Sequence, residues 1–189
     1  MKTTTLNKIR DFAPCADGWA KLLKYLGKTA ADDEPLSFST ILESNGLKDA
    51  LWCCQSATEY NREWRLFAVW CARQVQHLML DPRSIAAIDV AERYANGLAT
   101  DAELGAARVM ARVAAWATPV AKLTERAARE AARSAVWDET EEDEGEIARA
   151  AAWAEMAGAA RAAQIIKFRE IISGETVWKP ITTTISASF

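Results

Sequence analysis

Four basic side chains recur at helical spacing in the second half of the chain, on Lys122, Arg126, Arg129 and Arg133. Spacings of four, three and four residues place them in one line along a helix. Trp137 follows at the end of this basic ridge. Such a ridge can contact a phosphate backbone or an acidic protein, and tryptophan is a frequent anchor in protein interfaces. An ordinary solvated helix face has the same pattern, so both interpretations stay open.

A dense acidic run follows the ridge directly. The nine positions 138–146 hold seven carboxylates, among them Glu139, Glu141, Glu142 and Glu144. This density, together with one glycine, predicts a loop between two long helices or a fraying helix end. Metal or glycosidase chemistry needs carboxylates on a rigid cleft, so we expect a solvated or partner-binding surface instead. The basic ridge with Trp137, or these four glutamates, is the expected partner-binding set.

Candidates for catalysis are few. His77 is the only histidine, and no serine or cysteine nucleophile is placed beside it by sequence, so a packed, hydrogen-bonded histidine is expected. The four cysteines, Cys15, Cys53, Cys54 and Cys71, form no C-x-x-C pair and are expected to behave as free, buried, small apolar residues. Phosphate-binding loops, nucleophile elbows and H-E-x-x-H sites do not occur in the sequence. No catalytic residue, cofactor or metal ligand is therefore predicted.

Composition bounds the class of protein. The net charge is −3 for 189 residues, which attracts neither nucleic acid nor an anionic membrane as a whole. No apolar run reaches the roughly 18 residues that a membrane span needs, and the first residues lack the apolar centre of a signal peptide. We therefore expect a cytoplasmic protein whose partner is a protein, with no membrane contact.

The stretch 60–80 predicts the helix around which the rest of the chain packs. One face of that helix would carry Tyr60, Trp64, Phe67, Cys71, Val75 and Leu78, with Leu66, Trp70 and His77 on a flank. A helix that is apolar around most of its circumference is covered by neighbours on several sides. We expect this helix at the centre of the fold.

Local signals mark the ends of several helices. Asp81-Pro82 predicts a helix start, Asn96-Gly97 its end, and Thr100 with Glu103 the next start. In the N-terminal part, Asp17 is expected to cap a helix that ends at Gly27, Ser37 or Ser39 to open one that ends at Asn45-Gly46, and 47–52 to form another. A last helix is expected over about 146–172. No stretch shows the sustained alternation of a strand.

These elements predict an all-α fold, in which a compact head of short helices is followed by long, alanine-rich antiparallel helices. We divide the chain into a helical head over 1–100, an alanine-rich hairpin over 101–173 that packs on the head or extends from it, and an extended or disordered tail over 174–189. The oligomeric state does not follow from the sequence.

Residues 71–108, CARQVQHLMLDPRSIAAIDVAERYANGLATDAELGAAR, resemble a family of immunity proteins found beside bacterial toxin genes. Over nearly the whole chain, phrases such as CADGWAKLL, LGKT, ADDEPLSFSTILESNGL and DALW are similar to alanine-rich proteins of tailed phages and prophages. The resemblance implies an accessory protein of helical fold in a bacterial host cell, and it supplies no catalytic residues. Two regions depart from the pattern, 105–164 and 176–189, and are expected to serve this protein's own partner.

We therefore expect a non-enzymatic inhibitor that occludes a bacterial protein, either a toxin or a component of a defence system. Charge complementarity between such an inhibitor and its target speeds their association. The alternative is a nucleic-acid or nucleotide binder that uses the basic ridge on a helix over 119–137, and whose affinity falls steeply with salt.

Overall fold

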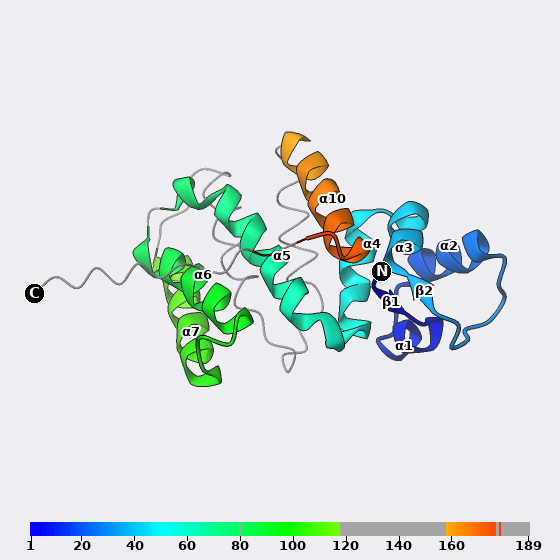
Figure 1. Ribbon diagram of the computed structural model, residues 1–189, viewed down its shortest axis with the longest axis horizontal. Helices are drawn as coiled ribbons and strands as arrows, with labels where there is room; N and C mark the ends of the chain where they lie inside the picture. Colours follow the sequence, from blue (N-terminus) through cyan, green and yellow to red (C-terminus); the bar gives the residue numbers. More distant parts are fainter. Residues whose placement is uncertain (80, 118–157, 177, 179–189) are drawn as a thin grey trace, which may run out of the picture.

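The computed structural model describes residues 1–79, 81–117, 158–176 and 178, and these residues form an all-α fold, as predicted (Figure 1). Three short 3-10 turns, at Cys53–Ser56, Thr58–Tyr60 and Gln76–Leu78, flank the helix α5 (Asn61–Gln74). The elements in chain order are β1 (Thr3–Thr4), α1 (Leu6–Asp11), α2 (Ala16–Leu26), β2 (Leu36–Ser37), α3 (Phe38–Asn45), α4 (Leu47–Trp52), α5 (Asn61–Gln74), α6 (Pro82–Ala95), α7 (Asp101–Ala117) and α10 (Gly158–Ser173).

Helix α5 runs across the middle of the molecule and contributes to two separate cores (Figure 1). Trp64 and Phe67 lie in the first core, with residues of β2, α1 to α4 and α10. Val69 and Ala72 lie in the second core, with residues of α6 and α7. The prediction that neighbours cover this helix on several sides is confirmed. Its two buried sides face opposite ends of the molecule.

The predicted central helix is shorter than expected. It ends at Gln74, and residues 76–78 form a 3-10 turn instead of another helical turn. The amide of Val75 donates to the carbonyls of Ala72 and Arg73, which closes the helix. Arg73 then holds the turn: its guanidinium lies 2.7 Å from Gln76 Oε1, 2.7 Å from Asp89 Oδ1 and 2.6 Å from Glu92 Oε2. This ion cluster fixes the end of α5 against α6.

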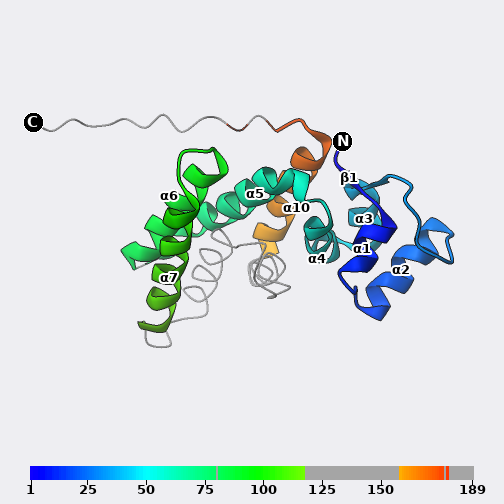
Figure 2. The same ribbon diagram turned by 90° about the horizontal axis from the view of Figure 1, so that it is seen from below.

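A two-stranded sheet, which the sequence did not predict, joins the N-terminus to the start of α3. Thr3 pairs with Ser37 and Thr4 with Leu36 in antiparallel register. The amide of Lys2 also donates to the carbonyl of Ile172 at 2.7 Å, so the first residues lie beside the end of α10 (Figure 2). Each strand has only two residues, too few to show an alternating pattern in the sequence.

Helix α10 completes the first core although more than 80 residues separate it from the other helices of that core. Phe168, Ile171 and Ile172 are fully buried there. The Phe168 ring stacks on Trp64, with centroids 6.0 Å apart, and meets Phe67 edge-on at 5.5 Å. Residues 1–100 therefore share their core with residues of the predicted hairpin. The division into head, hairpin and tail stays a prediction, because 118–157 and 179–189 lie outside the described residues.

Most predicted helix ends are confirmed at the level of single hydrogen bonds. Asp81 accepts from the amide of Arg83 at 2.9 Å, with Pro82 in the first turn. Thr100 and Glu103 form the reciprocal capping pair, at 2.7 Å and 3.2 Å. Gly27 ends α2 with φ of 66°, a left-handed conformation that favours glycine.

One cap was predicted wrongly. Cys15, not Asp17, is the residue at the N-terminal cap of α2, and it makes no side-chain capping bond. Asp17 is the second residue of the helix, where a carboxylate still interacts favourably with the positive end of the helix dipole. The preference for acidic residues near a helix start therefore gave the right region and the wrong position.

Candidate functional site

The predicted partner-binding residues lie outside the part of the chain that the structure describes. They are Lys122, Arg126, Arg129, Arg133, Trp137, Glu139, Glu141, Glu142 and Glu144. The nucleic-acid alternative rests on the same ridge. Both stay predictions, and a candidate site among the described residues has to be built from other side chains.

Three of the four thiols are unsuited to nucleophilic chemistry. Burial raises the pKa of Cys53 to about 12 and the pKa of Cys71 to about 12, and it raises the pKa of Cys54 well above its usual range. The thiolate is the reactive form, so these three thiols stay protonated and inert at neutral pH. Cys15 differs, because it is exposed at the start of α2. The prediction of buried cysteines is right for Cys53 and Cys54, nearly so for the half-buried Cys71, and wrong for Cys15.

The prediction of a packed His77 is also wrong. His77 is exposed on the 3-10 turn after α5. The predicted packing assumed that the helix continues to residue 80, which would place His77 beside Leu66 and Trp70. Because α5 ends at Gln74, the residues after it no longer follow that helical face.

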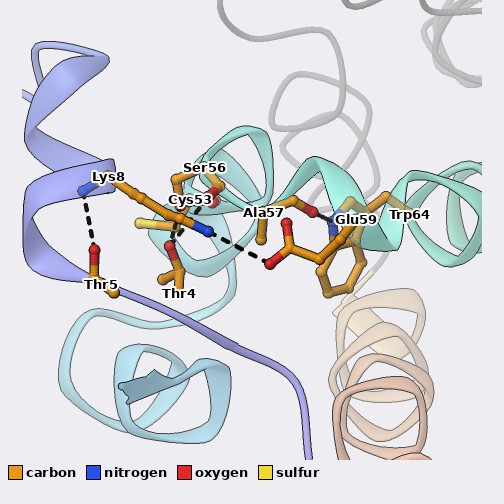
Figure 3. Close-up of polar contacts among 8 residues, drawn as sticks. All are labelled: Thr4, Thr5, Lys8, Cys53, Ser56, Ala57, Glu59 and Trp64. Carbon is orange, nitrogen blue, oxygen red and sulfur yellow. Dashed lines mark hydrogen bonds and ion pairs between the residues drawn. The ribbon is translucent and has the colours of Figure 1, made fainter. Parts of the chain in front are cut away.

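A hydroxyl network lies beneath the N-terminal strand (Figure 3). Ser56 Oγ donates to the carbonyl of Cys53 at 2.6 Å, and Thr4 Oγ1 lies 2.8 Å from Ser56 Oγ. The neighbouring Trp64 Nε1 donates to the carbonyl of Ala57 at 3.1 Å. Ser56 is only 6% exposed, so a substrate cannot reach its hydroxyl. These hydrogen bonds connect β1 to the turn that follows α4, and connect that turn to α5. Their role is structural.

Helix α7 carries apolar residues on two opposite sides. Leu104, Ala107 and Ala111 face α6 and are buried in the second core. The opposite side, which we call the outer α7 face, consists of Ala102, Ala106, Val109, Met110 and Val113, all exposed. Val109, Met110 and Val113 are 57%, 52% and 45% exposed. Large apolar side chains that share one exposed helix face are typical of an interaction surface.

The outer α7 face was not predicted as a site from the sequence. The inner side shows why, since it is built mainly from alanine: Ala87 and Ala91 of α6 share the second core with Ala107 and Ala111 of α7. Small side chains let two helices approach closely, so the alanines are buried and the valines stay outside. The sequence signal for the buried side was the spacing of Leu104, Ala107 and Ala111, which lie three and four residues apart and so share one helix face. Hydrophobicity alone would favour the valines as the buried side, because valine is more apolar than alanine.

A groove lies between α3 and α10. It has a volume of about 410 Å³ and is lined by Ser39, Leu42, Glu43, Ile166, Arg169, Glu170, Ser173 and Glu175. Ile166 at its edge is 61% exposed. Its lining thus combines apolar side chains with charges of both signs.

Over the described residues, no three or more His, Cys, Asp or Glu side chains are grouped so as to hold a metal ion. In the same part of the chain, none of the helices has the length and apolar character to span a membrane. Comparison with protein-family models, with curated proteins and with solved structures finds no match to this chain. The outer α7 face and the α3–α10 groove are the two candidate binding surfaces in the described part of the chain.

Proposed function

We propose that this protein is a non-enzymatic inhibitor that binds a bacterial partner protein and occludes it, in the manner of a phage counter-defence or immunity-type protein. The observation that carries the proposal is the outer α7 face. Its residues Ala106, Val109 and Val113 recur at spacings of three and four, the pattern by which a helix lays one face into a groove of a partner.

The exposed area of this face is large enough to matter for binding. Covering the exposed half of a valine or methionine side chain contributes roughly 1 kcal/mol. Val109, Met110 and Val113 together would contribute about 3 kcal/mol, which corresponds to a change of roughly a hundredfold in affinity. Such residues suit the centre of an interface, where a few side chains carry most of the binding energy.

The second core supports the same role because it holds the face rigidly. Leu104, Ala107 and Ala111 anchor the opposite side of α7 against α6, and the Thr100 and Glu103 capping pair fixes where the helix begins. The Tyr94 hydroxyl also lies 2.7 Å from Asp101 Oδ1, which ties the first turn of α7 to α6. A rigid binding face loses little conformational entropy when a partner docks.

The resemblance of residues 71–108 to immunity proteins of toxin loci supports the class of partner, because α6 and the first eight residues of α7 lie within that segment. The basic ridge and the acidic run supply opposite charges that would steer a charged target. Occlusion needs no chemistry at the interface. A partner whose active or binding surface is covered by α7 loses its access to substrate.

The experiment is a pull-down of the tagged protein from bacterial lysate, with and without nuclease, read by mass spectrometry. Three baits are compared: the wild type, the double variant Val109→Glu with Val113→Glu, and the control Ala20→Glu. Glutamate is tolerated on an exposed helix surface, so each bait should fold. Ala20 is exposed on α2, at the opposite end of the molecule from α7 (Figure 1).

The proposal expects one stoichiometric protein that survives nuclease, is captured equally by wild type and Ala20→Glu, and is lost with the double variant. Loss of about a hundredfold or more in affinity is expected, because a carboxylate would be buried without a partner. Nucleic acid alone, released as salt rises, would instead favour the alternative that uses the basic ridge.

A further inference from the structure

We propose that the α3–α10 groove binds a short segment of a second protein, in which a lysine or arginine lies next to an aliphatic residue. This surface is separate from the outer α7 face, and the proposal does not depend on the function proposed above. Its basis is the combination of rigid walls, apolar side chains and charges of both signs in one groove.

Each wall of the groove is one face of a helix. Helix α3 supplies Ser39, Leu42 and Glu43, where Leu42 and Glu43 follow Ser39 by three and four residues. Helix α10 supplies the other wall, with Ile166, Arg169, Glu170 and Ser173 on one side of the helix. Residues three and four apart share a helix face, so both walls are continuous stripes. The volume of about 410 Å³ is within the usual range for binding pockets.

The first core holds both walls in place. Phe38 and Ile41 anchor α3 in this core, and Phe168 and Ile172 anchor α10 in the same core. All four side chains are fully buried. The groove is therefore formed before any ligand arrives, which keeps the entropy cost of binding low.

The apolar part of the groove fits an aliphatic side chain. Ile166 is 61% exposed at its edge, and Leu42, which belongs to the first core, lines it from the opposite wall. An aliphatic group placed there would remove apolar surface from water, mainly that of Ile166, since Leu42 is only 7% exposed.

The charges of the groove favour a cation beside that aliphatic group. Glu170 is already paired with Lys167, whose Nζ lies 2.9 Å from Glu170 Oε2. Glu43, Glu175 and Arg169 make no ion pair with any residue in the described part of the chain. The contact of Glu43 is with the Tyr25 hydroxyl at 3.5 Å, at the limit for a hydrogen bond. Among the described residues, these two carboxylates outweigh the single guanidinium of the groove.

Arg169 makes the groove's preference for a ligand more specific than a general attraction of cations to the carboxylates. Its guanidinium offers several N–H donors to a backbone carbonyl or carboxylate of the same segment, and it opposes a second cation nearby. A uniformly basic peptide is therefore a poorer fit than one in which basic and aliphatic residues alternate. An acidic segment would be repelled by Glu43 and Glu175, which outnumber Arg169.

Three synthetic peptides test the proposal with the full-length protein. The first carries lysine next to leucine in a glycine and serine background, the second has glutamate in place of lysine, and the third has serine in place of leucine. Binding is followed by fluorescence anisotropy, and amide NMR spectra locate the bound peptide. The first peptide should bind most tightly and should shift the amide signals of Ser39, Glu43, Arg169 and Glu175.

Variants then assign the charge effect to the groove. Glu43→Gln and Glu175→Gln should each weaken binding of the first peptide by about two- to fivefold, the range for exposed ion pairs. Asp33→Asn is the matched control, because Asp33 is an exposed acid outside the groove, and it should leave binding unchanged. Ile166→Ser should also weaken binding without unfolding the protein, since Ile166 is exposed.

The proposal is overturned if no peptide binds, if the acidic peptide binds as well as the first, or if the shifted signals lie away from the groove. An equal effect of Asp33→Asn and Glu43→Gln would overturn it too, because general charge attraction would then account for binding. These outcomes leave the α7 proposal untouched, since none of the variants changes that helix.

Discussion

Replacing Phe168 with alanine tests whether a helix from the end of the chain belongs to the core of the N-terminal helices. Phe168 has 0% exposed surface. It packs between the rings of Trp64 and Phe67, at centroid distances of 6.0 Å and 5.5 Å. The truncation therefore removes a ring from an aromatic cluster that joins α5 to α10.

The expected loss is about 3–5 kcal/mol in the free energy of unfolding, the usual cost of Phe→Ala in a core. Whole domains are stable by about 5–15 kcal/mol, so this loss is a large part of the total. The surrounding side chains cannot easily close the cavity. Trp64 is fixed by its hydrogen bond to the carbonyl of Ala57, and the neighbouring Ile171 and Ile172 are already fully buried.

The assay is urea unfolding followed by circular dichroism, with Ile166→Ala as the control on the same helix. Ile166 is 61% exposed, so this control should change stability by no more than about 0.5 kcal/mol. If Phe168→Ala does not fold, Phe168→Leu provides a milder truncation of the same ring, with a smaller expected loss. A Phe168→Ala midpoint equal to that of Ile166→Ala would refute the placement of α10 in the first core.

Three further predictions follow from local geometry. Ser56→Ala should lower the free energy of unfolding by about 1–2 kcal/mol in urea, because it breaks a buried hydroxyl network but leaves a backbone carbonyl for Thr4. The hydrogen bond with Arg83 lowers the pKa of Asp81. The contribution of the Asp81 carboxylate to the free energy of unfolding is therefore complete above the usual carboxyl pKa and is lost as pH falls through the lowered value. The stability difference between wild type and Asp81→Asn should therefore shrink below about pH 4 in urea titrations. With an aromatic disulfide reagent, Cys15 should react in the folded protein, and the other thiols only after unfolding, namely Cys53, Cys54 and Cys71.

Helix ends were the part of the fold that the sequence predicted best. Asp81-Pro82, the Thr100 and Glu103 pair and Gly27 act through hydrogen bonds or backbone angles within a few residues. Their effect therefore does not depend on distant parts of the chain. The central position of α5 was also predictable, because an apolar circumference requires neighbours on more than one side.

Features that depend on distant residues were beyond the sequence. Nothing near Phe168 indicates that it packs with Trp64, because the two residues meet only after the chain has folded. The end of α5 at Gln74 depends on the Arg73 cluster, whose partners Asp89 and Glu92 lie on the next helix. The exposed position of His77 follows from that early end.

The candidate sites show the same limit. Choosing which side of α7 is buried requires knowing that α6 presents alanines to it, and the α3–α10 groove joins helices far apart in sequence. The expected binding residues on the ridge and acidic run stay predictions, because they lie outside the described residues. Sequence patterns located charged and apolar stripes, but packing decides which apolar stripe remains exposed.

The central claim is that a partner covers the outer α7 face, and thiol footprinting of the complex tests it most directly. Val109→Cys is placed in a Cys15→Ser background, which removes the exposed native thiol, and Ala20→Cys in the same background is the control. The rate of maleimide labelling is measured with and without the captured partner. We expect the partner to slow labelling at position 109 strongly and to leave position 20 unchanged. Equal labelling rates at position 109 in the free and bound protein would contradict the claim.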